Sequence, residues 1–205
     1  MTDATPDETS AQHKARMQEM QKSQAKRRRE LTDPERGLVL VHTGDGKGKS
    51  SSAFGVMARA LGWDKKIAVV QFIKGKWKTG EKNFFARFPD AIDWHVMGEG
   101  FTWDTQDRAR DIEAAEKALA TAAGLIASGT YDLVVLDEIH IALRYDYLEP
   151  DAVIAALEAR GETAVILTGR NAPQALMDYA DTVTEMTEIK HAYHGGIRAQ
   201  QGIDF

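Results

Sequence analysis

The chain has 205 residues, a formal net charge of −5 and no cysteine. This length fits one ordinary domain with appendages and is too short for two full-sized domains. The lack of cysteine excludes disulfides, thiolate metal sites and cysteine nucleophiles, and the start of the sequence lacks the apolar stretch of a secretory signal. Because no apolar run approaches the ~20 residues that span a bilayer, we predict a soluble cytoplasmic protein with no membrane partner. The acidic balance argues against a general nucleic-acid binder.

Residues 1–36 form a polar extension whose charge is uneven. From His13 to Arg36 the chain carries eight Lys or Arg residues against four acids. The composition permits a helix but supplies almost no apolar stripe, so this segment cannot build a core alone. Three interpretations stay open: a solvated, partly disordered tail, a contact with nucleic acid or membrane, and a helix that docks on the domain. Composition favours the tail over the nucleic-acid or membrane contact.

Residues 37–205 alternate between short apolar runs and helical patterns. The runs predict strands at 38–42, 67–73, 92–97, 133–136, 164–168 and 182–187, and helical spacing recurs at 50–61, 107–127 and 151–160. Strands that read as continuous apolar runs are buried on both faces, and the helices between them would cover those faces. The pattern predicts an α/β domain, a three-layer sandwich around a mostly parallel sheet.

A glycine-rich loop follows the first strand and opens the first helix. Its residues are Thr43, Gly44, Asp45, Gly46, Lys47, Gly48, Lys49 and Ser50. This is the setting of a Gly-x-x-x-x-Gly-Lys-Ser/Thr phosphate loop, with Thr43 in place of the first glycine. The glycines allow backbone N–H groups to surround an anion at the positive end of the helix. The loop predicts a P-loop NTPase-like (RecA-like) fold that binds a nucleoside triphosphate.

Side chains of this loop supply positive charge and a hydroxyl. Lys49 would reach phosphate oxygens, and we favour a phosphate contact over a solvated role for Lys47. The hydroxyl of Ser50 suits Mg²⁺, and Ser51 extends the nucleotide-binding segment into the helix. A carboxylate among phosphates is repulsive, so we expect Asp45 to point outward.

Two acids, Asp137 and Glu138, end the most apolar predicted strand. The carboxyl ends of parallel strands are where an open α/β sheet binds its ligands. These carboxylates could hold Mg²⁺ or, in a hydrolase, position an attacking water, and the motif does not choose between the two. The structural alternative is a helix cap or a pair with Arg144. Arg170 follows a later strand, where a ligand contact and a surface ion pair are about equally expected.

Several further segments occur together in one order along the chain. They are 44–50, 70–75 (Val-Gln-Phe-Ile-Lys-Gly), 98–103 (Gly-Glu-Gly-Phe-Thr-Trp), 137–138, 142–148, 168–170 and the tail 190–193 through 199–205. Over roughly residues 36–205 the chain resembles the P-loop corrinoid adenosyltransferases of the cobalamin-pathway type. The Phe-Thr-Trp block and the tail are the most specific parts of this resemblance.

The resemblance implies transfer of the 5′-deoxyadenosyl group of ATP to the Co(I) of a reduced corrinoid, with release of triphosphate. It implies ATP bound in reverse, Mg²⁺ (with Mn²⁺ as an alternative ion), a reduced flavin or flavodoxin-like electron donor, and a homodimer. Lys47, Lys49 and Glu138 would serve the leaving triphosphate and its metal. Phe101 and Trp103 would form an apolar wall that excludes an axial cobalt ligand, although aromatic residues are often simply core. The basic extension becomes a helix that covers the corrinoid.

Two other functions fit the phosphate loop alone. One is an ATPase or kinase acting at phosphorus, and the other is a nucleotide-dependent nucleic-acid-binding module that uses the basic extension. His191 and His194 invite a metal interpretation, but they lack a carboxylate partner of recognised spacing, so we predict no zinc site.

Overall fold

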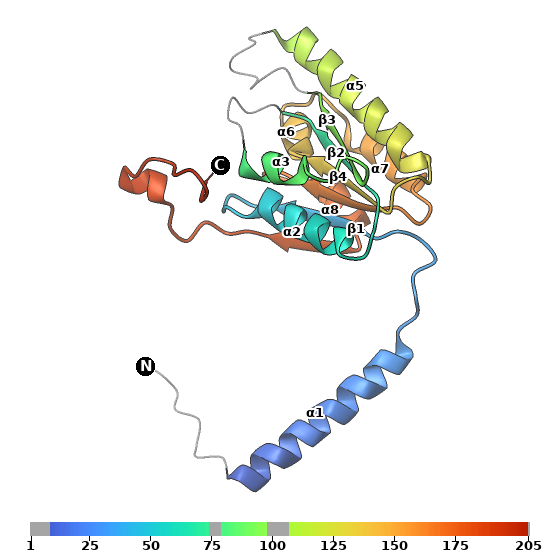
Figure 1. The fold of residues 1–205 in the computed structure, drawn as a ribbon, viewed down its shortest axis with the longest axis vertical. Helices are drawn as coiled ribbons and strands as arrows, with labels where there is room; N and C mark the ends of the chain where they lie inside the picture. The colour runs from blue at the N-terminus through green and yellow to red at the C-terminus, as the bar shows by residue number, and fades with distance from the viewer. Residues whose placement is uncertain (1–8, 74–78, 98–106, 205) are drawn as a thin grey trace. The chain divides into compact units, whose positions relative to one another are not determined.

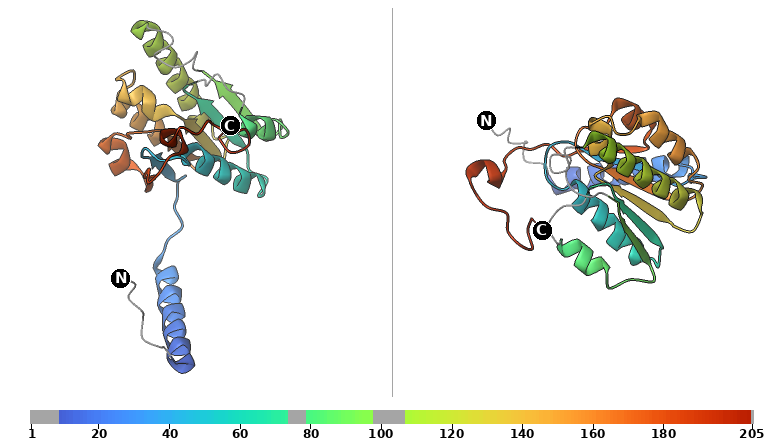
Figure 2. Two further views of the ribbon diagram at one scale, coloured as in Figure 1. Left: turned by 90° about the vertical axis from the view of Figure 1, so that its left-hand side faces the viewer. Right: turned by 90° about the horizontal axis from the view of Figure 1, so that it is seen from above.

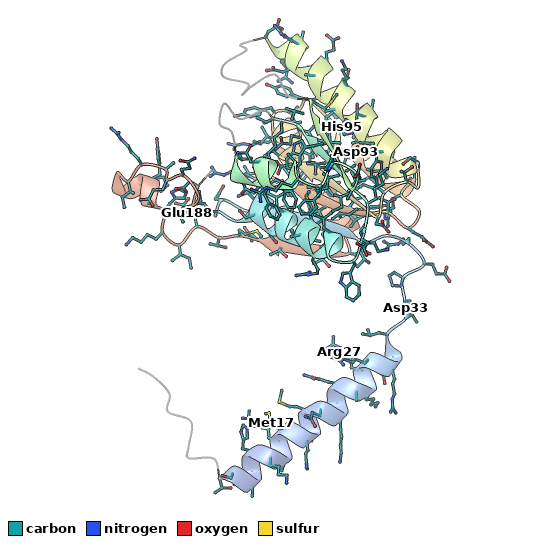
Figure 3. All side chains as sticks on the ribbon, viewed as in Figure 1. Met17, Arg27, Asp33, Asp93, His95 and Glu188 are labelled. Carbon is teal, nitrogen blue, oxygen red and sulfur yellow. The ribbon has the colours of Figure 1, made fainter. Side chains whose placement is uncertain are left out.

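The computed structural model describes residues 9–73, 79–97 and 107–204. The chain divides into two compact units, Met1–Glu35 and Arg36–Phe205. The first contains helix α1 (Ser10–Glu30), which begins with a capping box: the Thr9 hydroxyl accepts from the Gln12 amide N–H, and the Gln12 side chain accepts from the Thr9 amide. No residue of α1 is buried, and Figure 3 shows Met17 and Arg27 projecting from it. The capping box stabilises the start of this helix.

The second unit is built on a six-stranded sheet in the order β3-β2-β4-β5-β1-β6, with every pair parallel. The strands are β1 (Val39–Thr43), β2 (Ile67–Gln71), β3 (Ile92–Val96), β4 (Leu133–Asp137), β5 (Ala164–Thr168) and β6 (Thr182–Glu185). Figure 1 shows the strands between layers of helices. The predicted α/β sandwich of P-loop type is confirmed, and the described sheet is wholly parallel.

Helices cover both faces of this sheet. They are α2 (Lys49–Leu61), α3 (Gly80–Phe85), α5 (Arg108–Ala127), α6 (Ile139–Arg144), α7 (Pro150–Glu158) and α8 (Gln174–Tyr179), followed by the 3₁₀ turn η1 (Ala192–Gly195). Alternate strand residues point to opposite faces. Val69, Val135 and Ile166 pack with α2 and α3, whereas Val70, Val134 and Leu167 pack with α5 to α8. Figure 2 shows the two helical layers from two further directions.

Element boundaries differ from the sequence prediction where strands end at the site. The predicted strand 182–187 stops at Glu185 because Met186 exchanges hydrogen bonds with the phosphate loop: its N–H donates to the Thr43 carbonyl, and its carbonyl accepts from Gly46. The predicted strand 67–73 likewise ends at Gln71. In the part of the chain that the structure describes, no helix is long and apolar enough to cross a membrane.

Candidate functional site

The carboxyl ends of β1, β4 and β5 surround a cavity of about 540 Å³. Its wall contains Asp45, Gly46, Lys47, Gly48, Lys49, Ser50 and Ser51 of the phosphate loop, together with Asp137, Glu138 and Arg170. The fold thus brings most of the residues singled out in the sequence into one place. This is the edge at which an open parallel sheet binds ligands.

The phosphate loop has the backbone shape that its glycines predict. Gly44 has φ +95° and Gly48 has φ +117°, a region that L side chains rarely adopt. A Cβ on Gly44 would also lie 2.4 Å from the Met186 carbonyl oxygen. The Gly46 N–H donates to that same oxygen at 2.7 Å, so this N–H is engaged by the chain leaving β6. At position 44, the close approach of Met186 and the positive φ together require glycine.

The two loop lysines differ in their surroundings. Lys49 is 7% exposed, and its ammonium donates to the Gly46 carbonyl at 2.6 Å. Burial lowers the pKa of Lys49, and the Glu138 carboxylate partly offsets this. Lys47 is exposed and pairs with Asp204 of the C-terminal tail at 2.5 Å. Asp45 is exposed on the loop.

Thr43 lies behind the loop. It is buried, and its hydroxyl accepts from the Ala172 N–H at 3.0 Å. The side chain that replaces the motif's first glycine thus ties the loop to the segment after β5.

Asp137 is fixed by two hydrogen bonds that cross the sheet. One carboxylate oxygen accepts from the Thr168 hydroxyl at 2.9 Å, and the other accepts from the Gln71 side-chain amide at 3.0 Å. The side-chain amide oxygen of Gln71 in turn accepts from the Trp94 indole N–H at 2.9 Å. Thr168 also accepts from the Glu138 backbone N–H at 3.0 Å. A carboxylate held in this way has one orientation.

Glu138 stands beside Asp137 in a left-handed conformation, with φ +60° and ψ +25°. Burial, followed by the neighbouring Asp137 carboxylate, raises the pKa of Glu138 to about 7. Asp137 is buried and Glu138 is partly buried, so the neighbouring carboxylates repel each other, and a divalent cation would relieve that repulsion. With the Ser50 hydroxyl on the same wall, the donors are all oxygens, which is the set that Mg²⁺ prefers. The residues therefore fit this ion.

Arg170 lies on the cavity wall with Lys49 and Glu138. Burial lowers the pKa of Lys49, and the Arg170 charge adds to this lowering. At Glu138, where burial and the Asp137 charge raise the pKa, the Lys49 charge and then the Arg170 charge oppose the rise. Arg144, the last residue of α6, and Tyr145, which follows that helix, also line the cavity. Phe101 and Trp103 lie outside the described residues.

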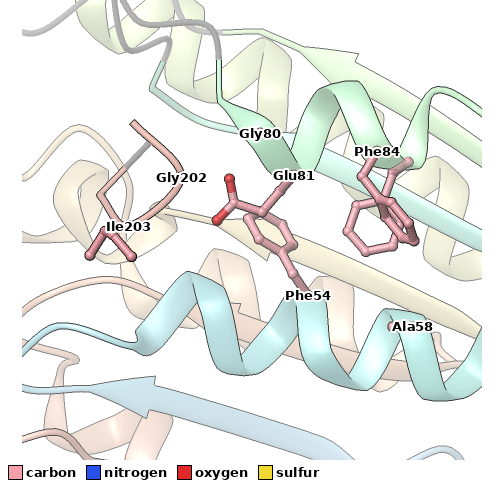
Figure 4. A pocket seen from close by; sticks show the side chains of 8 residues that line it. Phe54, Ala58, Gly80, Glu81, Phe84, Gly202 and Ile203 are labelled. Carbon is pink, nitrogen blue, oxygen red and sulfur yellow. The ribbon is translucent and has the colours of Figure 1, made fainter. Parts of the chain in front are cut away.

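A second cavity, of about 410 Å³, adjoins the first and is mostly apolar (Figure 4). Phe54 and Glu81 border both cavities. Phe84 and Phe85 of α3 and Ile203 of the tail line the rest. The first cavity is thus lined by the charged phosphate loop, and the second is lined mainly by apolar side chains.

The histidines of the tail make local contacts. His194 lies 3.0 Å from a Glu188 carboxylate oxygen, and His191 accepts from the Tyr193 N–H. Within the described ranges, no three His, Asp or Glu side chains are grouped to hold a metal. A divalent ion at Asp137 and Glu138 would thus need ligands from the nucleotide.

Sequence reasoning assigned no role to several residues that shape the site. Gln71 and Thr168 position Asp137, and His140 contacts Gly169 beneath Arg170. Gln71 and Thr168 are polar residues at the carboxyl ends of otherwise apolar strands, and that placement is a usable signal. His140 lies in a helix too short to show a pattern.

The fold and the loop define a P-loop nucleotide-binding protein. A family model for the ATP:corrinoid adenosyltransferases BtuR/CobO/CobP matches residues 35–205. The chain therefore belongs to the corrinoid adenosyltransferase family.

Curated relatives agree with this assignment. A corrinoid adenosyltransferase of Pseudomonas aeruginosa is 58% identical over 172 residues, which cover 83% of this chain and 85% of the relative. One from a Sinorhizobium species is 46% identical over 206 residues, covering 99% and 96%. The corrinoid adenosyltransferase CobA of Salmonella typhimurium is 46% identical over 172 residues, covering 83% and 87%. The resemblance noted in the sequence is thus confirmed.

Proposed function

We propose that this enzyme transfers the 5′-deoxyadenosyl group of ATP to the Co(I) of a reduced corrinoid. The observation that carries the proposal is the single cavity that joins the phosphate loop to Asp137, Glu138 and Arg170 in a chain of this family. Family membership favours this reaction over an ATPase, a kinase or a nucleic-acid-binding module.

In the proposed reaction, Co(I) donates an electron pair to the ribose C5′ as the bond from C5′ to the triphosphate oxygen breaks. The triphosphate leaves with that bond's electron pair, and the cobalt becomes formally Co(III) in the new cobalt–carbon bond. No proton is transferred, so the residues need only bind, orient and neutralise charge.

Lys49, Lys47 and the loop N–H groups would stabilise the charge that grows on the leaving triphosphate. The short contact of Lys49 with the Gly46 carbonyl shows that its ammonium lies within the loop, and Arg170 extends the positive wall. Ser50, Asp137 and Glu138 would hold Mg²⁺, with Mn²⁺ as an alternative, and the ion would supply further charge neutralisation at the phosphates. We also propose that ATP lies with its γ-phosphate deepest in the loop and C5′ toward the corrinoid.

Other parts of the proposal rest on the resemblance. Residues 1–36 would form a basic extension that covers the corrinoid, residues 37–205 the catalytic domain, and Phe101 and Trp103 the wall that excludes an axial ligand. A homodimer, a reduced flavin or flavodoxin-like electron donor and a cytoplasmic location also stay predictions.

The reaction is tested anoxically with ATP, Mg²⁺ and chemically reduced corrinoid. Absorbance follows the cobalt–carbon bond, and chromatography identifies the polyphosphate. We expect stoichiometric triphosphate and a loss of about 10²-fold in rate for Lys49→Ala, because an electrostatic donor to the leaving group is removed. Lys65→Ala is the matched control, since Lys65 pairs with Asp132 on the surface. Release of orthophosphate without corrinoid would refute the proposal.

A further inference from the structure

The turn that carries Arg170 is held by three contacts from two elements, β1 and α6. The Gly169 N–H donates to the His42 carbonyl at 3.2 Å, and the Ala172 N–H donates to the Thr43 hydroxyl at 3.0 Å. Both contacts come from the end of β1. The third contact comes from α6, where His140 Nδ1 lies 3.1 Å from the Gly169 carbonyl oxygen. Because that oxygen can only accept, Nδ1 carries the hydrogen.

His140 and Gly169 are packed too closely for another residue at position 169. Gly169 has φ +138°, and a Cβ added to it would lie 2.8 Å from the His140 Cβ. His140 itself is fully buried. The backbone and Cβ of His140 thus pack against Gly169, and the imidazole ring adds the hydrogen bond to its carbonyl oxygen.

The second ring nitrogen of His140 argues against a purely structural role. Nε2 is buried and has no hydrogen-bond partner in the described parts of the chain. A buried polar atom without a partner lowers stability, so an apolar residue would suit packing better than histidine does. Among the described residues, the ring's hydrogen bond is the contact of Nδ1 with Gly169.

We propose that His140 is a positioning residue that directs Arg170 toward the phosphates of ATP. By fixing the Gly169 carbonyl, the Nδ1–H prevents rotation of the peptide that precedes Arg170. The guanidinium is thereby held on the same wall as Lys49 and Glu138. This inference rests on ATP occupying the phosphate-loop cavity, as proposed above.

The test is a double-mutant cycle on the full chain, with the dissociation constant of ATP–Mg²⁺ as the readout. His140→Leu should weaken binding about 5- to 20-fold, the range expected for one hydrogen bond that orients a charged group. His140→Asn should bind within about threefold of the unchanged protein, because its amide N–H₂ occupies nearly the place of Nδ1. In an Arg170→Ala background, His140→Leu should add less than about twofold, since residues that act as a unit are not additive.

His95→Leu is the matched control. His95 also has a buried Nε2 without a partner in the described chain, but it lies on β3, and Figure 3 labels it there. Its replacement should leave ATP binding within about twofold, as expected for sites with no shared partner. The melting temperature of each variant is recorded, and binding is measured well below it.

Equal weakening by His140→Leu in both backgrounds, or a His140→Asn variant as weak as His140→Leu, would overturn the inference. If Arg170→Ala alone binds ATP normally, the proposed role of Arg170 fails, which is a different result from a failure at His140. If His140→Leu does not fold, His140→Asn is compared with His140→Gln, whose amide lies one carbon further out. We then expect the glutamine variant to be the weaker binder, and the reverse order would overturn the inference.

Discussion

Thr168→Val should destabilise the domain more than its small change in size suggests. Thr168 is fully buried, and its hydroxyl makes two hydrogen bonds, one to the Asp137 carboxylate and one from the Glu138 N–H. Valine keeps the shape but leaves one oxygen of the Asp137 carboxylate and the Glu138 N–H without their hydrogen-bond partner. Two such losses cost about 2–3 kcal/mol, one of them to a charged group. At roughly 2–4 °C per kcal/mol, the melting temperature should fall by about 4–12 °C.

Thr184→Val is the matched control, because Thr184 has the same side chain on the exposed strand β6. A surface substitution of this kind should stay within about 0.5 kcal/mol of the unchanged protein. Thermal unfolding and urea titration of both variants give the comparison. If Thr168→Val is as stable as Thr184→Val, then the hydroxyl does not hold Asp137, and the described network is not what orders the strand ends.

Two further predictions concern the hydrogen-bonded pairs Asp181–Arg36 and Trp94–Gln71. Asp181 binds Arg36 through both oxygens and accepts from the Val39 N–H, and the Arg36 contact holds the pKa of Asp181 at about 2. The stabilisation from the ionised Asp181 is present above the unfolded pKa of about 4 and is lost as pH falls toward 2. In urea titrations, Asp181→Asn should therefore have a lower free energy of unfolding at pH 7. Near pH 2, the free energies of unfolding of the variant and the unchanged protein should converge. Trp94→Phe removes the donor to Gln71 and should cost about 0.5–1.5 kcal/mol of unfolding free energy. It should also raise the Mg²⁺ concentration needed for half-maximal activity, and an unchanged Mg²⁺ requirement would argue that Gln71 does not orient Asp137.

The long elements could be predicted from the sequence because their patterns are local. Helix α5 runs over Arg108–Ala127 where 107–127 was expected, and β5 has the predicted bounds. Helices α3, α6 and α8 have six residues each and were not predicted, since fewer than two turns give no readable period. Helix α6 also begins after Glu138 in a left-handed conformation, which no propensity indicates.

The same distinction applies to the site. The phosphate loop is contiguous in the sequence, so its chemistry can be recognised without the fold. The contact between Thr168 and Asp137 joins residues 31 positions apart, and that between Gln71 and Asp137 joins residues 66 apart. Both depend on β4 lying between β2 and β5, and this strand order becomes known only with the sheet. Local patterns cannot specify it.

The unequal environments of the two carboxylates bear on the reaction itself. Asp137 is held by donors on both oxygens, whereas burial and the Asp137 charge raise the pKa of Glu138 to about 7. A pKa near neutrality often marks a general base, and a P-loop hydrolase would use such a residue on water. Attack of Co(I) on C5′ transfers no proton, so here the raised pKa is better explained by like charge in a buried place. A cation held by these residues would lower the Glu138 pKa again. Glu138→Gln should therefore raise the Mg²⁺ concentration needed for half-maximal rate and change the pH profile of the rate less.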